Sequence, residues 1–344
     1  MRFGAFSYAY STNVGDEIQT LAATQFLPRV DALIERDRLH WYRNCSPIFV
    51  IFNGWFTRQP CWPPPDSILP LFVAFHAAKP ELLVNKRDVD YFKRHEPIGC
   101  RSLATLEAFR RIGVDAYFSA CLTLTLKPEP VERSDQIYAV DVDPALYERL
   151  IPDGVKKMTA RLSHEFPPPG AGLPTRAKWN SARTLLRGLY KWDVTRPILA
   201  GAGERLNRSR HLFRLSKARE ILSRYSSAKL VITSRLHCAL PCLALGTPVL
   251  LLRPGVESDP RFAGLRELVR FHSDPSSPIK IDWRNPDPNP DTYLGYAKAL
   301  RERCENAVAR MSRPDCATAT PAECVQNPPS NSNSSHNRKE MSCV

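Results

Sequence analysis

The stretch KLVITSRLHCALPCLALGTPVLLL, residues 229–252, contains two apolar strands with a short helix between them. Residues 230–232 form an apolar run without polar alternation, which is typical of a strand buried on both faces of a parallel sheet. Gly246 suits the residue that follows a helix, Pro248 prevents the helix from continuing, and residues 249–252 begin the next buried strand. The stretch therefore predicts a parallel α/β fold with a tight strand-to-helix turn.

That turn carries polar side chains. Ser234 suits the N-cap, so Arg235 and His237 fall in the first helical turn, where backbone N–H groups lack partners and the helix dipole favours anions. Because Pro241 has no amide donor, the regular helix begins near His237 or is kinked there. Ligands of α/β proteins bind at the carboxyl ends of parallel strands, so the turn predicts an anion site with a proton donor. The alternative is that Arg235 and His237 only cap the helix and pack.

A second strand-to-helix turn lies near the N-terminus, in the sequence NVGDE. Residues 2–9 predict the strand and residues 17–26 predict the helix. Gly15 lets the backbone come close to a ligand or to a neighbouring strand. Asn13 and Asp16 either cap the helix or contact a ligand directly, and the spacing alone does not decide between these roles.

A third such turn lies within residues 97–126, which predict a strand, a helix over 102–111 and a further strand over 116–126. Arg101 stands directly before the helix. From that position its guanidinium can bind a phosphate or a carboxylate in a bidentate manner.

Together, the segments S-R-L-H at residues 234–237, NVGDE at 13–17 and PIGCRSLATLEAFRRIGVDAYFSACLTLTL at 97–126 resemble the polysaccharide pyruvyl transferase family. The resemblance covers roughly residues 1–270. It implies two Rossmann-like α/β domains that face each other across a cleft, as in GT-B glycosyltransferases. It also implies phosphoenolpyruvate (PEP) as donor and a sugar hydroxyl pair as acceptor. The family usually has glycine at the position of Ala120.

The implied chemistry accounts for the residue types. Arg101 and Arg235, with backbone amides near Leu236, would hold the phosphate and carboxylate of PEP. His237 would protonate the methylene carbon, since an imidazole can supply a proton near neutral pH. A sugar hydroxyl then attacks, phosphate leaves, and the second hydroxyl closes a cyclic ketal. This scheme needs no metal and no cofactor besides PEP as co-substrate.

Further polar and aromatic side chains follow other predicted strands, at the edge where α/β crevices collect contacts. Trp55 either stacks on a sugar or closes its domain. His76, at the end of a strand over 71–76, is either a second proton carrier or a hydrogen-bonded structural residue. His164 lies at the end of the strand predicted over 155–165 and is placed to reach the cleft. The expected substrate-binding residues are Leu236, Ser234, Asn13, Gly15, Asp16, Asn53, Trp55, His76 and His164.

Composition narrows the class of protein. With 344 residues and 43% apolar residues the chain can form two domains, and no apolar run reaches the length of a membrane span. The start MRFGAFSYAYST lacks the pattern of a signal peptide, so we expect a cytoplasmic location. The ten cysteines show no zinc-binding spacing. The net charge of +13 indicates an acidic partner without identifying it.

The predicted organisation is an N-terminal domain over 1–143, a C-terminal domain over 144–311 and a disordered tail over 312–344. Residues 141–144 are expected to link the domains. Residues 166–211 are rich in proline, glycine and arginine and form either an extended excursion or a basic lid. A basic amphipathic helix over 291–311 is expected to cross back and cover the first domain.

Two other functions fit parts of the pattern. A glycosyltransferase of the same fold with a nucleotide-sugar donor would also place basic groups near a phosphate, although no acidic residue for a ribose is evident. A non-enzymatic protein that binds polyanions would explain the charge, but no clustered basic run or nucleic-acid-binding fold is recognised, so nucleic acid is not an expected partner.

Overall fold

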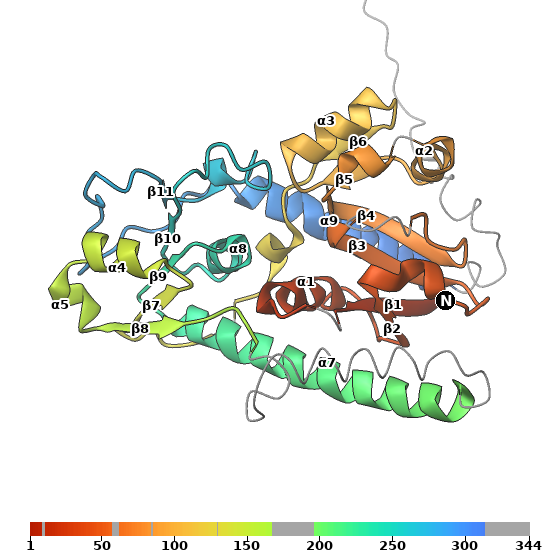
Figure 1. Ribbon diagram of the computed structural model, residues 1–344, viewed down its shortest axis with the longest axis horizontal. Helices are drawn as coiled ribbons and strands as arrows, with labels where there is room; N and C mark the ends of the chain where they lie inside the picture. The colour runs from red at the N-terminus through yellow and green to blue at the C-terminus, as the bar shows by residue number, and fades with distance from the viewer. Residues whose placement is uncertain (9–10, 57–61, 84, 129, 167–195, 314–344) are drawn as a thin grey trace, which may run out of the picture.

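The protein contains two parallel β-sheets flanked by helices, as the sequence predicts for Rossmann-like α/β domains (Figure 1). The first sheet has six strands in the order β2-β1-β3-β4-β5-β6, and the second has five in the order β11-β10-β9-β7-β8. Every pairing in both sheets is parallel. The computed structural model describes residues 1–8, 11–56, 62–83, 85–128, 130–166 and 196–313.

The first half of the chain builds the first sheet. Its strands are β1 (Arg2–Ser7), β2 (Ala32–Glu35), β3 (Ile48–Phe56), β4 (Ile68–Ala77), β5 (Ile98–Cys100) and β6 (Ala116–Phe118). Its helices are α1 (Val14–Thr24), α2 (Lys86–Lys93) and α3 (Leu103–Arg111), with 3-10 turns η1 (Arg36–Trp41), η2 (Pro80–Leu83) and η3 (Leu122–Thr125).

The second half builds the second sheet. Its strands are β7 (Ile137–Val140), β8 (Thr159–Leu162), β9 (Leu230–Thr233), β10 (Val249–Leu252) and β11 (Phe271–His272). Its helices are α4 (Pro144–Leu150), α5 (Asp153–Lys156), α7 (Arg196–Ser227), α8 (Leu236–Ala244) and α9 (Leu294–Met311), with the 3-10 turn η5 (Arg266–Leu268).

Strand order reverses once in each sheet, between β1 and β3 and between β7 and β9. At such a reversal the two neighbouring connections leave on opposite faces of the sheet and open a crevice at the carboxyl ends of the strands. The central strands are buried and apolar, as in Leu230, Val231 and Ile232. The predicted character of the 229–252 stretch is therefore confirmed, including the left-handed conformation of Gly246 after α8 (φ 68°).

Two long helices connect the halves. In Figure 1, α7 runs beneath both sheets, and α9 crosses from the second sheet toward the first. Buried residues of α9 such as Leu300 and Val308 pack with Phe3 and Phe49 of the first sheet, which confirms the predicted covering helix. Arg301 of α9 also donates to the carbonyl of Thr125 at 3.0 Å.

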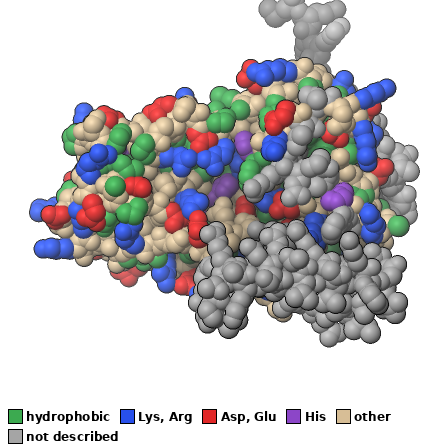
Figure 2. Space-filling model, viewed as in Figure 1, with side chains coloured by type: hydrophobic (Ala, Val, Ile, Leu, Met, Phe, Trp, Pro, Cys, Tyr) green, Lys and Arg blue, Asp and Glu red, His purple; other side chains and the backbone are tan. Residues whose placement is uncertain are grey.

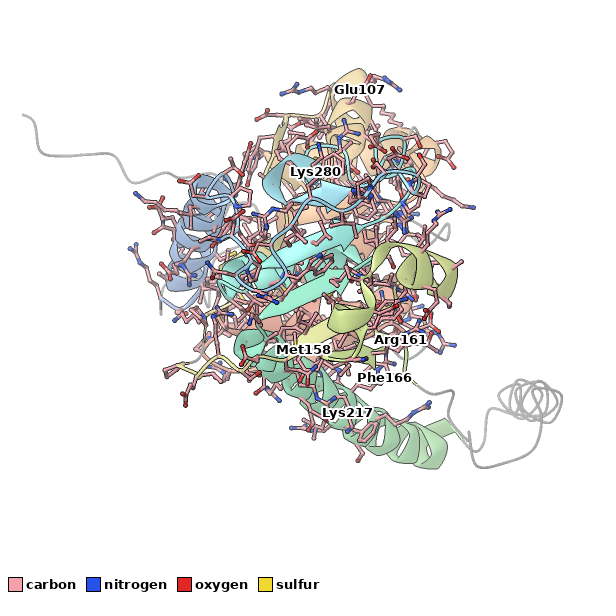
Figure 3. All side chains as sticks on the ribbon, turned by 90° about the vertical axis from the view of Figure 1, so that its left-hand side faces the viewer. Glu107, Met158, Arg161, Phe166, Lys217 and Lys280 are labelled. Carbon is pink, nitrogen blue, oxygen red and sulfur yellow. The ribbon has the colours of Figure 1, made fainter. Side chains whose placement is uncertain are left out.

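Helix α7 is held to α1 by a buried ion pair. The Arg214 Nε atom lies 2.8 Å from Oε1 of Glu17, which is fully buried. Burial raises the pKa of Glu17 to about 8, and the Arg214 charge opposes that rise. Arg214 also lies over the ring of Phe166, which Figure 3 shows between β8 and α7. Phe166, in the segment after β8, thus packs on the arginine of this ion pair.

The strand predicted over 116–126 is shorter than expected. It ends at Phe118, because Ala120 adopts a left-handed conformation (φ 58°) and η3 follows. Strand β3, in contrast, continues to Phe56 across an irregular register. Past β10, residues 261–269 contain the short turn η5, and β11 lies beside β10.

The connection between the sheets also differs from the prediction. β7 pairs with β9, so the elements of the second sheet begin at Ile137, and the predicted division at 143 and 144 falls between β7 and α4. Of the 166–211 stretch, residues 167–195 lie outside the described residues, whereas residues 196–211 belong to α7. Residues 314–344 of the predicted tail also lie outside the described residues. No helix in the described part of the chain is long and apolar enough to cross a membrane.

Candidate active site

The turn after β9 has the predicted kink at His237. Helix α8 begins at Leu236, but His237 departs from helical geometry (φ −82°, ψ 16°), and Pro241 lies within the helix. The N-cap is Arg235 rather than the predicted Ser234. The Ser234 hydroxyl instead donates to the backbone oxygen of Asp141 at 2.6 Å, which ties this turn to the end of β7.

The turn after β5 brings Arg101 to the same place. Its backbone N–H donates to the carbonyl of Phe75 at the end of β4, and its side chain is buried, with 3% of the residue exposed. The Nη1 atom of Arg101 lies 3.2 Å from Nε2 of His237. Two predicted site residues 136 positions apart in the sequence are therefore in direct contact.

The N-terminus of α1 forms a third wall. Asn13 caps this helix by accepting from the Gly15 amide at 3.0 Å. A Cβ atom on Gly15 would lie 2.9 Å from Cβ of His237, which is closer than such atoms normally approach. Only glycine lets α1 come this near to α8, so the NVGDE and SRLH motifs meet at one point.

The contact with Arg101 defines how His237 is hydrogen-bonded. A guanidinium only donates, so Nε2 of His237 accepts and the ring proton of the neutral imidazole is assigned to Nδ1. Burial, and then the charge of Arg101, lower the pKa of His237 well below its usual value. Without an anion beside it, His237 is a neutral hydrogen-bond acceptor.

Arg101 is a buried cation. Its guanidinium has no carboxylate partner among the residues that the structure describes, and its Nε atom has no hydrogen-bond acceptor there. A buried charge is costly unless it is paired, and burial accordingly lowers the pKa of Arg101. Figure 2 shows Lys or Arg and His side chains gathered in the middle of this face, between the two sheets. The arrangement favours binding of an anion.

Comparison with known proteins bears on this site. The family model described as polysaccharide pyruvyl transferase matches residues 13–255, well over half of the 344-residue chain. The chain belongs to this family. No curated protein matches it significantly. A solved structure of an uncharacterized protein from Klebsiella pneumoniae subsp. pneumoniae is similar with a TM-score of 0.40 and 12% identity, over 79% of this chain and 93% of its own.

The matched residues span all three motifs and Ala120, the position where the resemblance leads us to expect glycine. The left-handed conformation of Ala120 (φ 58°) gives the reason, because glycine adopts it without strain. In this chain alanine occupies the position, and it is fully buried.

Arg235 has a different environment from Arg101. Its Nε atom lies 2.8 Å from Oδ2 of Asp141, and its Nη2 atom lies 2.9 Å from Oε1 of Glu165. Asp141 was predicted to be part of a linker, but it ends β7 in a left-handed conformation (φ 48°) that turns its carboxylate toward β9. Arg235 is thus a paired, half-exposed cation.

The two other predicted histidines are held in structural hydrogen bonds. Nδ1 of His76 lies 3.0 Å from Oγ of Ser102 and 3.1 Å from Oγ1 of Thr105, at the start of α3. Burial, and then Arg101, lower the pKa of His76 to about 2, which does not suit a proton donor at neutral pH. His164 is fully buried, and its Nε2 atom lies 2.6 Å from the Tyr225 hydroxyl, so it does not line an open cleft.

The remaining predicted residues lie around this centre. Asp16 accepts from Ser11 and pairs with Arg36 at 3.4 Å, in the first turn of α1. Asn53 is buried within β3 and is not past its end, and Trp55 stands in register with His76 of β4. Leu236 is half-buried and packs on the core of the second sheet.

Sequence reasoning missed four residues of this region. Gln19 bonds to Arg101, while Asp141 and Glu165 bond to Arg235. Arg261 follows β10, is held by Asp259, and adds to the charges that lower the pKa of His237. For these four residues, the one local signal in the sequence is that Gln19 lies one helical turn after Gly15.

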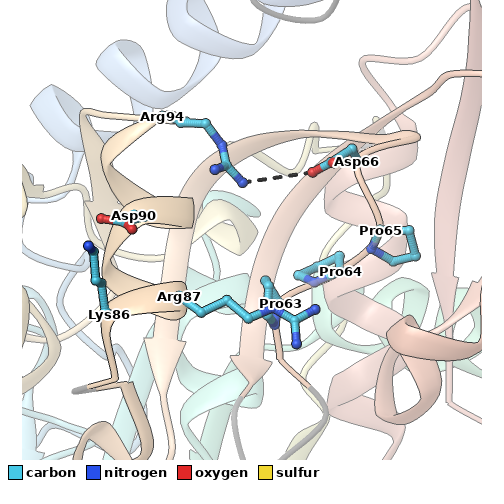
Figure 4. Close-up of a pocket in the computed structure, with 8 residues that line it drawn as sticks. All are labelled: Pro63, Pro64, Pro65, Asp66, Lys86, Arg87, Asp90 and Arg94. Carbon is cyan, nitrogen blue, oxygen red and sulfur yellow. Dashed lines mark ion pairs between the residues drawn. The ribbon is translucent and has the colours of Figure 1, made fainter.

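A separate pocket of about 570 Å³ lies on the first half of the chain, between the proline-rich stretch before β4 and helix α2 (Figure 4). It contains neither Arg101 nor His237, and its ion pair between Arg94 and Asp66 is exposed. Its lining residues are Pro63, Pro64, Pro65, Asp66, Lys86, Arg87, Asp90 and Arg94.

Proposed function

We propose that this family member transfers the pyruvyl group of PEP to a sugar diol of a glycan, forming a cyclic ketal and releasing phosphate. The observation that carries the proposal is the buried Arg101 guanidinium, which has no carboxylate partner among the described residues and touches the imidazole of His237. PEP offers two anionic groups and a carbon that must be protonated. An unpaired cation beside a histidine fits both requirements.

The donor would be held from both sheets, in a GT-B-like arrangement of facing domains. Arg101 would bind one anionic group from the first half of the chain, and Arg235, with the amide of Leu236 at the start of α8, would bind the other. Arg235 must yield part of its contact with Asp141 or Glu165 to do so.

A bound anion would also change the protonation state of His237. A carboxylate or phosphate that pairs with Arg101 removes the cationic effect on the imidazole and favours its protonated form. His237 then gives a proton to the methylene carbon of PEP, and positive charge develops at the neighbouring carbon. The first sugar hydroxyl forms a C–O bond there, and its proton restores the protonated His237. The C–O bond to the phosphate then breaks, phosphate leaves with the electron pair, and the second hydroxyl closes the ketal as its proton passes to the released phosphate.

The acceptor would lie on the side of the first sheet. Trp55 lies near the end of β3, one of the two strands at the switch point where α/β folds bind ligands, and it offers a half-buried aromatic surface beside His76. Asn53, predicted as a further contact, is buried within β3 and would act only through its bond to Gln19. Sugar rings pack well on such surfaces because their C–H faces are apolar.

The test is to incubate the protein with PEP and a panel of sugar and glycan acceptors while phosphate release is measured. Acceptor-dependent phosphate release, with a product heavier by one pyruvyl ketal, supports the proposal. A parallel panel of nucleotide sugars tests the glycosyltransferase alternative, and turnover of those donors alone would overturn the proposal. Absence of turnover with tight binding to anionic polymers would instead favour a polyanion-binding protein.

A further inference from the structure

The side chain of Gln19 lies where the three turns meet. Gln19 is on α1 and is buried, with 1% exposed, and its Oε1 atom accepts from Nη1 of Arg101 at 3.1 Å. The same nitrogen lies 3.2 Å from Nε2 of His237. A terminal guanidinium nitrogen carries two hydrogens, so one is directed to each acceptor. The position of Gln19 therefore determines where the second hydrogen points.

Hydrogen bonds hold both the side-chain amide and the backbone of Gln19. Its Nε2 atom donates to the carbonyl of Gly15 and to Oδ1 of Asp16, both at 3.3 Å. Its backbone oxygen accepts from Asn53 at 2.8 Å. Gly54 leaves just enough space for the amide, since a Cβ there would lie 3.0 Å from Oε1. The amide cannot turn away without breaking these contacts.

We propose that Gln19 is a positioning residue that holds the Arg101 guanidinium against Nε2 of His237, so that this nitrogen stays an acceptor until a substrate anion draws the guanidinium away. That His237 then acts as proton donor rests on the proposed function. The positioning role itself rests on the hydrogen bonds alone and can be tested without substrate.

The contact between Arg101 and His237 matters because of the groups that face His237. They are Arg101 after β5, His76 at the end of β4, His164 after β8 and Arg261 after β10. The charges of Arg101 and Arg261 disfavour a positive charge on the imidazole, and among the four groups Arg101 has the largest effect after burial itself. A small change in the charge or position of Arg101 should therefore change the proton affinity of His237.

The informative variant is Gln19→Glu, which keeps the shape of the side chain and places a carboxylate on Arg101. Gln25→Glu is the matched control, because Gln25 is the C-cap of the same helix and donates to Ala22 and Thr125, each at 2.9 Å, without a hydrogen bond to Arg101. Gln19→Met adds no charge but removes the acceptor. If Gln19→Glu does not fold, Gln19→Met tests the proposal instead. Thermal unfolding shows which variants are folded.

The measurement is an NMR titration of the histidine rings in the full chain, with His237 assigned by the signal that His237→Gln lacks. In Gln19→Glu the midpoint of His237 should move up by roughly 1 pH unit or more, because a nearby opposite charge favours the protonated form. Gln19→Met should move it in the same direction, and Gln25→Glu should leave it unchanged. An unchanged midpoint in the folded Gln19 variants overturns the proposal, whereas absence of PEP turnover in the wild type counts against the proposed function alone.

Discussion

Two arginines stand just past parallel strands in this protein, and their surroundings are opposite. Arg101, after β5, is buried and touches Gln19 and His237, with no carboxylate partner among the described residues. Arg235, after β9, is half-exposed and contacts two carboxylates, those of Asp141 and Glu165. The sequence predicted both arginines to lie at strand-to-helix turns and to bind the donor, Arg101 directly before its helix and Arg235 in the first helical turn.

The difference shows that position at a strand end does not define the role of an arginine. A guanidinium that already pairs with two carboxylates must exchange partners to bind a ligand, so its net contribution is small. A buried guanidinium without a counter-charge gains a partner when an anion binds. We therefore expect the first-sheet turn to dominate donor binding and the second-sheet turn to supply the proton carrier, His237.

The largest expected effect concerns that proton carrier. His237→Gln keeps a polar contact for Arg101 but cannot donate a proton to carbon, so turnover at saturating PEP should fall by about 10²–10⁴-fold. Binding of PEP should change much less. Rapid-quench measurement of phosphate release, together with PEP binding by calorimetry, separates the two effects. Near-normal turnover would show that His237 is only an anchor.

Replacement of the two arginines should reduce the affinity for PEP by different amounts. Arg101→Met should weaken PEP binding by about 1.5–3 kcal/mol, or 10- to 150-fold, because a charge-assisted bond to a buried cation is lost. Arg235→Met should weaken it by about 1 kcal/mol or less, roughly fivefold, because the loss is offset by bonds already shared with Asp141 and Glu165. Calorimetric titration of each variant with PEP tests this order. Equal losses would mean that Arg235 leaves its carboxylates completely when the donor binds.

Local patterns predicted much of this arrangement. The apolar runs and the glycine and proline signals around residues 230–252 gave both strands, the kink at His237 and the end of α8. Helix α3 was predicted by the same kind of evidence, over 102–111, and Ser102 proves to be its N-cap. These features depend on neighbours in the chain, so a sequence carries them directly.

The partners of the arginines could not be predicted in this way. Asp141 reaches Arg235 across 94 residues, and Gln19 reaches Arg101 across 82, through the packing of separate turns. Left-handed backbone at Ala120 also ended the strand predicted over 116–126 earlier than its apolar content suggested, and left-handed backbone at Asp141 directed its carboxylate to Arg235. Non-glycine residues rarely adopt this conformation, so residue type gave no warning.

The stability of the protein around the turn after β5 should also depend on pH, because His76 is buried against this turn. The folded state keeps this histidine neutral, with burial and Arg101 lowering its pKa to about 2, whereas the unfolded chain takes up the proton near pH 6.5. Stability is therefore present above pH 6.5 and is lost as the pH falls below it. At pH 5 the loss from His76 should be on the order of 2 kcal/mol. Urea unfolding at pH 7 and pH 5 measures it by comparison with His76→Asn, in which that part of the pH dependence should disappear. The same slope in both proteins would contradict a neutral, buried His76.

The smallest expected effect is on stability, and it should differ in sign between the two turns. Arg101→Met replaces a buried, uncompensated cation by an apolar side chain of similar length, so the free energy of unfolding should stay the same or rise by about 1 kcal/mol, despite two lost hydrogen bonds. Arg235→Met leaves the largely buried carboxylate of Asp141 without its cation and should lower the free energy of unfolding by about 1 kcal/mol. Both values come from urea unfolding at pH 7, where Asp141→Asn combined with Arg235→Met should recover most of the loss. If both single variants are destabilised equally, Arg101 is a structural residue like Arg235, and its unpaired charge does not mark a ligand site.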